Sequence, residues 1–76
     1  MKPSPYEILV NFLRNKLKSD RIITTKHVKG LSIFSGYKES TFTRKFREFI
    51  SKGYIEVEKL NNNTWYLKKI KEVTHD

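Results

Sequence analysis

The spacing of apolar residues changes at Gly53, and this change limits the folds open to the chain. Before Gly53, four apolar residues recur at the i, i+4, i+7, i+8 spacing of one helix face: Phe42, Phe46, Phe49 and Ile50. After it, residues 54–58 and 65–68 alternate between apolar and polar, with a polar stretch at 61–64 between them. Glycine favours the left-handed conformation that ends a helix, and asparagine tolerates that conformation in tight turns. The sequence therefore predicts a helix over residues 38–52 that leads into a β-hairpin.

An equally clear signal marks the start of a helix near the N-terminus. Ser4 is a favourable N-cap, Pro5 suits the first helical position, and Glu7 completes a capping box. We expect this helix to run to about Lys18, because Ser19 and the aspartate after it favour a break.

The segment between these two helices predicts a short strand and a further helix. Residues 21–24 form a β-branched run, and Thr24 or Thr25 can cap a helix that ends near Phe34. The 76 residues then form one α+β domain with an ordered core over about 5–70 and a frayed tail at 71–76.

The first helix has a wider apolar arc than one small core needs. Its second apolar face is made of Tyr6, Val10, Leu13 and Leu17. Apolar patches of this kind usually have a partner, so the second apolar face predicts a homodimer through this helix. The alternative is that the hairpin or the tail of the same chain covers the face.

Charge is concentrated in the middle of the chain. The formal net charge is +8, and residues 14–52 contain eleven basic and three acidic residues, so they account for all of the excess. A basic surface of this kind indicates an anionic partner, with nucleic acid as the first candidate. Membrane binding is not expected, because the polar side of the first helix has only Arg14 and Lys18 as cations.

Several classes of function are disfavoured by what the sequence lacks. There is no cysteine, no paired carboxylates and no glycine-rich phosphate loop, and neither His27 nor His75 has a second ligand at metal-binding spacing. We therefore expect no enzyme, cofactor, metal or small-molecule ligand. No apolar run reaches the roughly 18 residues of a membrane span and no signal peptide is evident, so a cytoplasmic, nucleoid-associated protein is expected.

The stretch Ser40-Thr41-Phe42-Thr43-Arg44-Lys45-Phe46, continued by Ile50-Ser51-Lys52-Gly53-Tyr54-Ile55, resembles the recognition helix and the step into the wing of winged helix-turn-helix regulators. The resemblance extends over about residues 5–70. It implies three helices, a short strand and a C-terminal β-hairpin wing, in a small DNA-binding regulator of bacterial, archaeal, viral or plasmid type. The absence of Ala and Gln beside abundant Lys is similar to usage in small proteins of archaeal viruses and plasmids.

The polar side of helix 38–52 has the chemistry that reads a major groove. The candidates for base contacts are Ser40, Thr43, Arg44 and Arg47. Arginine can donate two hydrogen bonds to guanine, whereas lysine and hydroxyl groups more often position the protein on phosphates. The candidates for phosphate contacts are Lys26, Lys29, Lys38, Thr41 and Lys45. The candidates on the wing are Lys59, Asn62, Asn63 and Lys68.

These features favour a double-stranded-DNA-binding transcription regulator, repressor-like, that places helix 38–52 in the major groove. A dimer would place two such helices in successive grooves. Three alternatives stay open: a winged-helix protein-interaction module of a replication or transcription complex, a protein that coats DNA without sequence preference, and an arginine face that is merely solvated. RNA binding is less favoured because the aromatic residues face a core.

Overall fold

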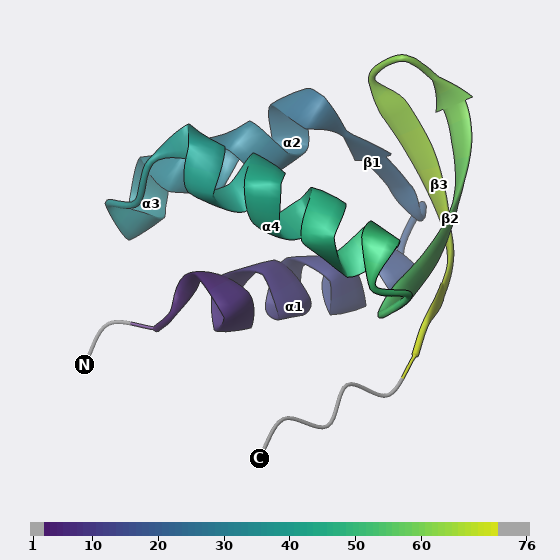
Figure 1. The fold of residues 1–76 in the computed structure, drawn as a ribbon, viewed down its shortest axis with the longest axis horizontal. Helices are drawn as coiled ribbons and strands as arrows, with labels where there is room; N and C mark the ends of the chain where they lie inside the picture. Colours follow the sequence, from purple (N-terminus) through teal and green to yellow (C-terminus); the bar gives the residue numbers. More distant parts are fainter. Residues whose placement is uncertain (1–2, 72–76) are drawn as a thin grey trace.

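The computed structural model describes residues 3–71. Its elements are α1 (Pro5–Leu17), β1 (Ile22–Thr24), α2 (Thr25–Gly30), α3 (Ser32–Ser35), α4 (Glu39–Ser51), β2 (Ile55–Asn61) and β3 (Thr64–Ile70) (Figure 1). The strands form one antiparallel sheet in the order β1-β3-β2. The fold is α+β, as predicted, and this arrangement is compatible with a winged helix. The predicted frayed tail at 71–76 is wrong for Lys71, whose N–H donates to the carbonyl of Tyr54 at 2.9 Å, and residues 72–76 lie outside the described part of the chain.

The two ends of α1 follow its sequence signals. Ser4 is the N-cap, and its Oγ accepts a hydrogen bond from the backbone N–H of Glu7 at 3.2 Å. Pro5 occupies the first turn, where its missing N–H costs nothing. The helix ends at Leu17, one residue before the predicted end, and Lys18 is its C-cap.

The helix predicted to end near Phe34 is divided into two short helices, so the described chain has four helices where three were predicted. Thr24 caps α2 through a 3.1 Å hydrogen bond from the N–H of His27. Beyond Gly30, the Ser32 hydroxyl donates to the carbonyl of Lys29 at 2.8 Å. Glycine is a weak helix former, and such a side-chain bond competes with the helical ladder, so the helix is interrupted here.

The predicted helix 38–52 is α4, which begins at Glu39 because Lys38 has extended backbone angles and provides no side-chain cap. It ends at Ser51, and Gly53 has the expected positive φ of 78°. The N–H of Tyr54 donates to the carbonyl of Phe49 at 2.9 Å and so closes the end of the helix.

The hairpin strands are longer than the alternation predicted, and their turn lies at Asn62 and Asn63. The sheet is completed by β1, in which Ile23 lies opposite Trp65 of β3. The N–H of Thr25 donates to the carbonyl of Asn63 at 2.9 Å, so the start of α2 is fastened to the tip of the hairpin.

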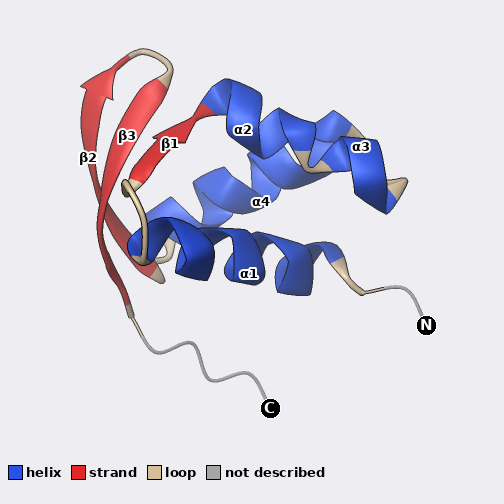
Figure 2. Cartoon of the chain, turned by 180° about the vertical axis from the view of Figure 1, so that it is seen from behind, coloured by secondary structure: helices blue, strands red, loops and turns tan. Residues whose placement is uncertain are grey.

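The core lies between α1, α2, α4 and the inner face of the sheet (Figure 2). Its buried residues are Leu9, Leu13, Ile23, Val28, Phe42, Phe46, Phe49, Ile55 and Leu67. Ile50, which was predicted to share the core face of α4, is half-buried at its edge. Among the described residues, no helix has the length and apolar character needed to cross a bilayer.

Candidate nucleic-acid interface

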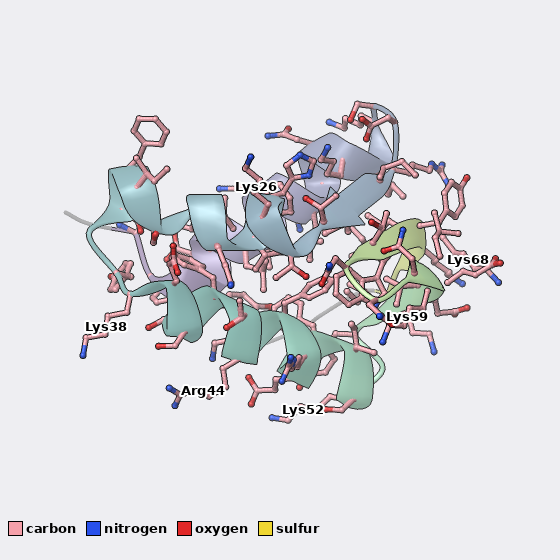
Figure 3. All side chains as sticks on the ribbon, turned by 90° about the horizontal axis from the view of Figure 1, so that it is seen from above. Lys26, Lys38, Arg44, Lys52, Lys59 and Lys68 are labelled. Atoms are coloured by element: carbon pink, nitrogen blue, oxygen red, sulfur yellow. The ribbon has the colours of Figure 1, made fainter. Side chains whose placement is uncertain are left out.

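The inner face of α4 is fixed by aromatic packing. The ring of Phe46 contacts that of Trp65 at a centroid distance of 5.1 Å, and the ring of Phe42 contacts that of Tyr37 at 6.1 Å. Because these rings hold one side of the helix against the core, the opposite side faces solvent. Arg44 projects outward there, together with Lys38 and Lys52 at the two ends of the helix (Figure 3).

Arg44 and Arg47 are the arginines of this face. Both side chains are exposed, and neither forms an ion pair with any residue in the described part of the chain. They lie three positions apart, so their guanidinium groups can reach the same groove. Ser40 is also exposed, near the start of the helix.

Thr43 is placed at the predicted position but has less donor capacity than expected. Its hydroxyl is half-buried and lies 3.4 Å from the carbonyl oxygen of Glu39 and 3.3 Å from that of Ser40. Bonds of this kind to the preceding turn are common for threonine in helices. A ligand that accepted a hydrogen bond from Thr43 would therefore compete with these two carbonyl oxygens.

A hollow of about 200 Å³ is lined by residues of α2, α4 and β3. It is lined by Thr25, Val28, Lys29, Thr43, Phe46, Arg47 and Trp65. Lys29 is exposed, lines this hollow together with Arg47, and forms no ion pair within the described residues. Lys38 is similarly exposed before the first turn of α4.

Lys45 differs from the other predicted phosphate contacts because an acidic residue holds it. Its Nζ lies 3.4 Å from Oε1 of Glu48, while Nζ of Lys52 lies 3.1 Å from Oε2 of the same carboxylate. Hydrogen bonds from Lys52 first, and then from Lys45, lower the pKa of Glu48 below its ordinary value. Glu48 also lines a hollow of about 290 Å³ with Arg44, Lys45 and the half-buried Thr41.

Lys26 lies apart from the rest of the predicted phosphate set. It borders a groove between α1 and the α2–α3 segment, together with Phe12, His27 and Leu31. Lys29 lines the hollow beside α4, whereas Lys26 lines the groove beside α1. The structure therefore separates Lys26 from the surface that contains Arg44.

The wing residues are divided between the two faces of the sheet. Lys59 pairs across the hairpin with Trp65, whose ring packs on α4, so Lys59 is on the α4 face. Lys68 is three residues beyond Trp65 and therefore on the opposite face, where its Nζ lies 3.8 Å from Oε1 of Glu58. Asn62 and Asn63 are exposed at the tip between the strands.

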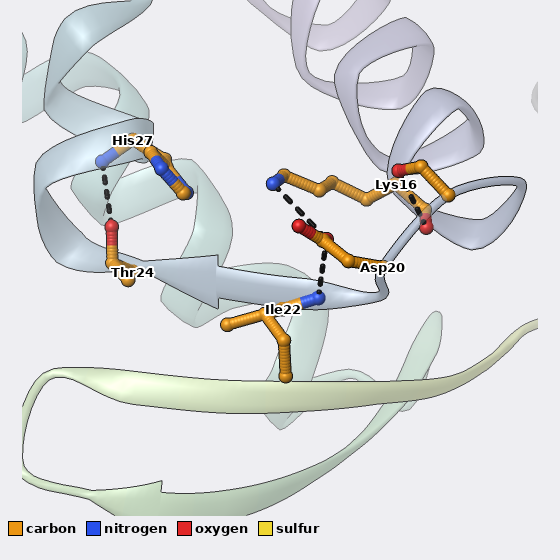
Figure 4. A network of polar contacts seen from close by, with 6 residues as sticks. Lys16, Asp20, Ile22, Thr24 and His27 are labelled. Atoms are coloured by element: carbon orange, nitrogen blue, oxygen red, sulfur yellow. Dashed lines mark hydrogen bonds and ion pairs between the residues drawn. The ribbon is translucent and has the colours of Figure 1, made fainter.

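A polar network fixes the segment that leads into α2 (Figure 4). Asp20 accepts a hydrogen bond from the N–H of Ile22 at 2.9 Å and pairs with Nζ of Lys16 at 3.3 Å. The backbone bond is the larger reason why the pKa of Asp20 is lowered. Arg21, at a positive φ of 64°, turns the chain between α1 and β1. This turn sends β1 along β3 and places α2 beside α4.

Comparison of the chain with protein-family models, with curated proteins and with solved structures gives no match. Sequence reasoning had missed Glu48 and the bond between Thr25 and the wing tip. A charge count identifies Glu48 as an acid within a basic helix, but the bond to the wing tip depends on tertiary structure and has no sequence signal.

Proposed function

We propose that this protein is a winged-helix transcription regulator that binds double-stranded DNA with α4 in the major groove. The observation that carries the proposal is the pair Arg44 and Arg47, exposed on the outer face of α4 without acidic partners in the described chain. Two unpaired guanidinium groups one helical turn apart suit an anionic groove, because no intramolecular ion pair must first be broken. The 13 residues of α4 give it a length of about 20 Å, and a major groove about 12 Å wide accepts one helix.

The residues around α4 make different kinds of contact in the proposed complex. Arg44 and Arg47 donate to guanine O6 and N7, the commonest specific contact of arginine. Lys29 and Lys38 contact phosphates on either side of the groove, and Lys59 extends this contact from the wing. Ser40 can donate or accept near the start of α4, while Thr43 accepts from base amino groups.

A second candidate function is supported by a different surface. Phe34 is 95% exposed and Ile33 is 74% exposed on α3, beside the groove of about 810 Å³ between α1 and the α2–α3 segment. Large exposed apolar side chains beside a groove are typical of protein-interaction sites. Within residues 3–71 no acidic side chain lines that groove, whereas Lys26 lines it without an ion pair, so an acidic apolar segment of a partner protein suits it.

The test is fluorescence anisotropy with labelled duplexes, first sites selected from a random pool and then unrelated sequences. The logarithm of affinity for duplex DNA is expected to fall linearly with the logarithm of salt concentration. Arg44→Ala and Arg47→Ala are each expected to weaken binding to the selected site by roughly 5- to 150-fold, equivalent to about 1–3 kcal/mol.

Lys26→Ala is the matched control, since it removes the same charge from the groove beside α1, which none of the residues of α4 lines. Its effect is expected to stay below about threefold, because only long-range electrostatics changes. Unchanged binding by both arginine variants, or affinity that does not depend on salt, would contradict the proposal. Equal affinity for all sequences would instead indicate unspecific coating of DNA.

A further inference from the structure

A groove of about 610 Å³ runs along the surface of α1 that the wheel predicted as a dimer face. Tyr6, Val10 and Leu17 line it and are half-buried, and Ile70 lies at its edge. Leu13 also reaches the groove but is 1% exposed, so it belongs to the core and cannot contribute much area to a partner. The apolar face is thus narrower than predicted, and Val10 and Leu17 are its half-buried aliphatic residues.

Three charged residues line the same groove, and one of them, Lys71, already pairs with Oε2 of Glu56 at 3.6 Å. Glu7 and Arg14 are exposed, and neither has an ion-pair partner within residues 3–71. The Glu7 carboxylate accepts a hydrogen bond from the Ser4 hydroxyl at a long 3.5 Å. Glu7 and Arg14 are seven positions apart, so they lie on one stripe of the helix, two turns from each other.

We propose that this groove is the interface of a homodimer in which the α1 helices of two copies pack antiparallel. The two-fold axis passes between Val10 and Asn11, because this point is midway between Glu7 and Arg14. Each charged residue is then about 5 Å along the helix from the axis. Glu7 therefore faces the partner's Arg14, and Arg14 faces the partner's Glu7, which gives two equivalent ion pairs.

The charge pattern selects this arrangement over others. A parallel pair would place Glu7 level with the partner's Glu7 and Arg14 level with the partner's Arg14, so neither ion pair could form. An antiparallel pair is self-complementary, as a two-fold interface must be. Self-association through the groove beside Phe34 is disfavoured, because it would bring together two copies of Lys26, which has no ion pair among the described residues.

The dimer leaves the candidate DNA surface free. Arg44 does not line the α1 groove, and α1 packs on the inner side of α4. The proposal is therefore independent of DNA binding, and its test uses the full chain without DNA.

The test is sedimentation equilibrium of the wild-type chain and of charge-reversal variants. The wild type is expected to dimerise, whereas Glu7→Arg and Arg14→Glu should each raise the dimer dissociation constant at least tenfold, since both ion pairs become like-charge contacts. The double variant Glu7→Arg/Arg14→Glu should restore dimerisation to within about threefold of the wild type. An equimolar mixture of the two single variants should form a heterodimer, because each chain then faces the opposite charge twice.

Circular dichroism of each variant checks folding, and Phe34→Ser is the control for the other apolar surface. A wild-type chain that stays monomeric, or charge reversals that leave the dimer unchanged, would overturn the proposal. Loss of the dimer in Phe34→Ser would assign the interface to the other groove instead. A chain ending at Lys71 that dimerises, when the full chain does not, would show that residues 72–76 occupy the α1 groove.

Discussion

Replacing Gly53 with alanine tests the corner that directs the chain from α4 into the wing. Gly53 has a φ of 78°, and its N–H donates to the carbonyl of Ile50 at 3.1 Å. With the 2.9 Å bond from the N–H of Tyr54 to the carbonyl of Phe49, this is a Schellman motif. The rings of Phe49 and Tyr54 pack at a centroid distance of 5.6 Å, which adds the hydrophobic contact that often accompanies the motif.

The loss of stability expected for Gly53→Ala comes almost entirely from the backbone conformation. A Cβ at Gly53 would meet nothing within 4 Å, so no clash contributes. A non-glycine residue in the left-handed region destabilises the folded state by about 1–2 kcal/mol. Alanine also lowers the conformational entropy of the unfolded chain, which offsets about 0.4–1 kcal/mol of this loss. We therefore expect Gly53→Ala to lower the free energy of unfolding by about 1 kcal/mol, or the Tm by about 4–8 °C for a domain of this size.

Gly30→Ala is the matched control and should have the opposite sign. Gly30 is the last residue of α2 and has no positive φ, and a Cβ added there would also meet nothing within 4 Å. Alanine is the better helix former, so a gain of up to about 1 kcal/mol is expected. Urea titrations followed by circular dichroism measure both values. Equal stability of Gly53→Ala and the wild type, or a loss in Gly30→Ala, would refute this account of the two glycines.

Two further predictions concern the acidic residues. Glu48→Gln should release Lys45 and Lys52 for phosphates, so the slope of log affinity for DNA against log salt concentration should become steeper by about 1–2. The control Glu58→Gln, on the far face of the sheet, should not change this slope. Weaker DNA binding by Glu48→Gln would contradict the prediction. Salt bridges lower the pKa of Glu48, and a backbone hydrogen bond at the start of β1 is the main cause of the lowered pKa of Asp20. The stabilising contribution of the two carboxylates is complete above about pH 5 and is lost as the pH falls through their lowered pKa values. The urea midpoint should therefore fall more steeply between about pH 6 and pH 2.5 in the wild type than in the double variant Asp20→Asn/Glu48→Gln. Parallel curves for the two proteins would refute this prediction.

The elements that were predicted correctly depend on local chemistry. Ser4 and Thr24 accept hydrogen bonds from backbone N–H groups three residues later, and Gly53 adopts the backbone angle that few other residues tolerate. Each of these interactions involves neighbours in the sequence, so the residue type is sufficient to predict it. The interruption after Gly30 was missed because glycine alone does not reveal that a hydroxyl will compete with the helix.

The candidate site was less predictable because it depends on which way each side chain faces in the folded chain. Lys26 and Lys29 look equivalent in a charge count, yet only Lys29 lies beside α4. Lys59 and Lys68 are likewise on different faces of the hairpin, and only the strand register separates them. Leu13 completes an apolar stripe on the wheel, but it is buried because the sheet and α4 close over α1.

The elements that contain the candidate site are joined to one another before any ligand binds. Thr25 fastens the start of α2 to the wing tip through the carbonyl of Asn63, and Phe46 packs on Trp65 to hold α4 against the hairpin. Lys29, Arg47 and the wing are thus parts of one body. Binding a rigid surface costs less conformational entropy than ordering a loop, so little of the contact energy with DNA would be lost to organising α4. In the proposed complex, the groups still to be ordered are the long exposed side chains of Arg44 and Arg47 and of the lysines assigned to phosphates.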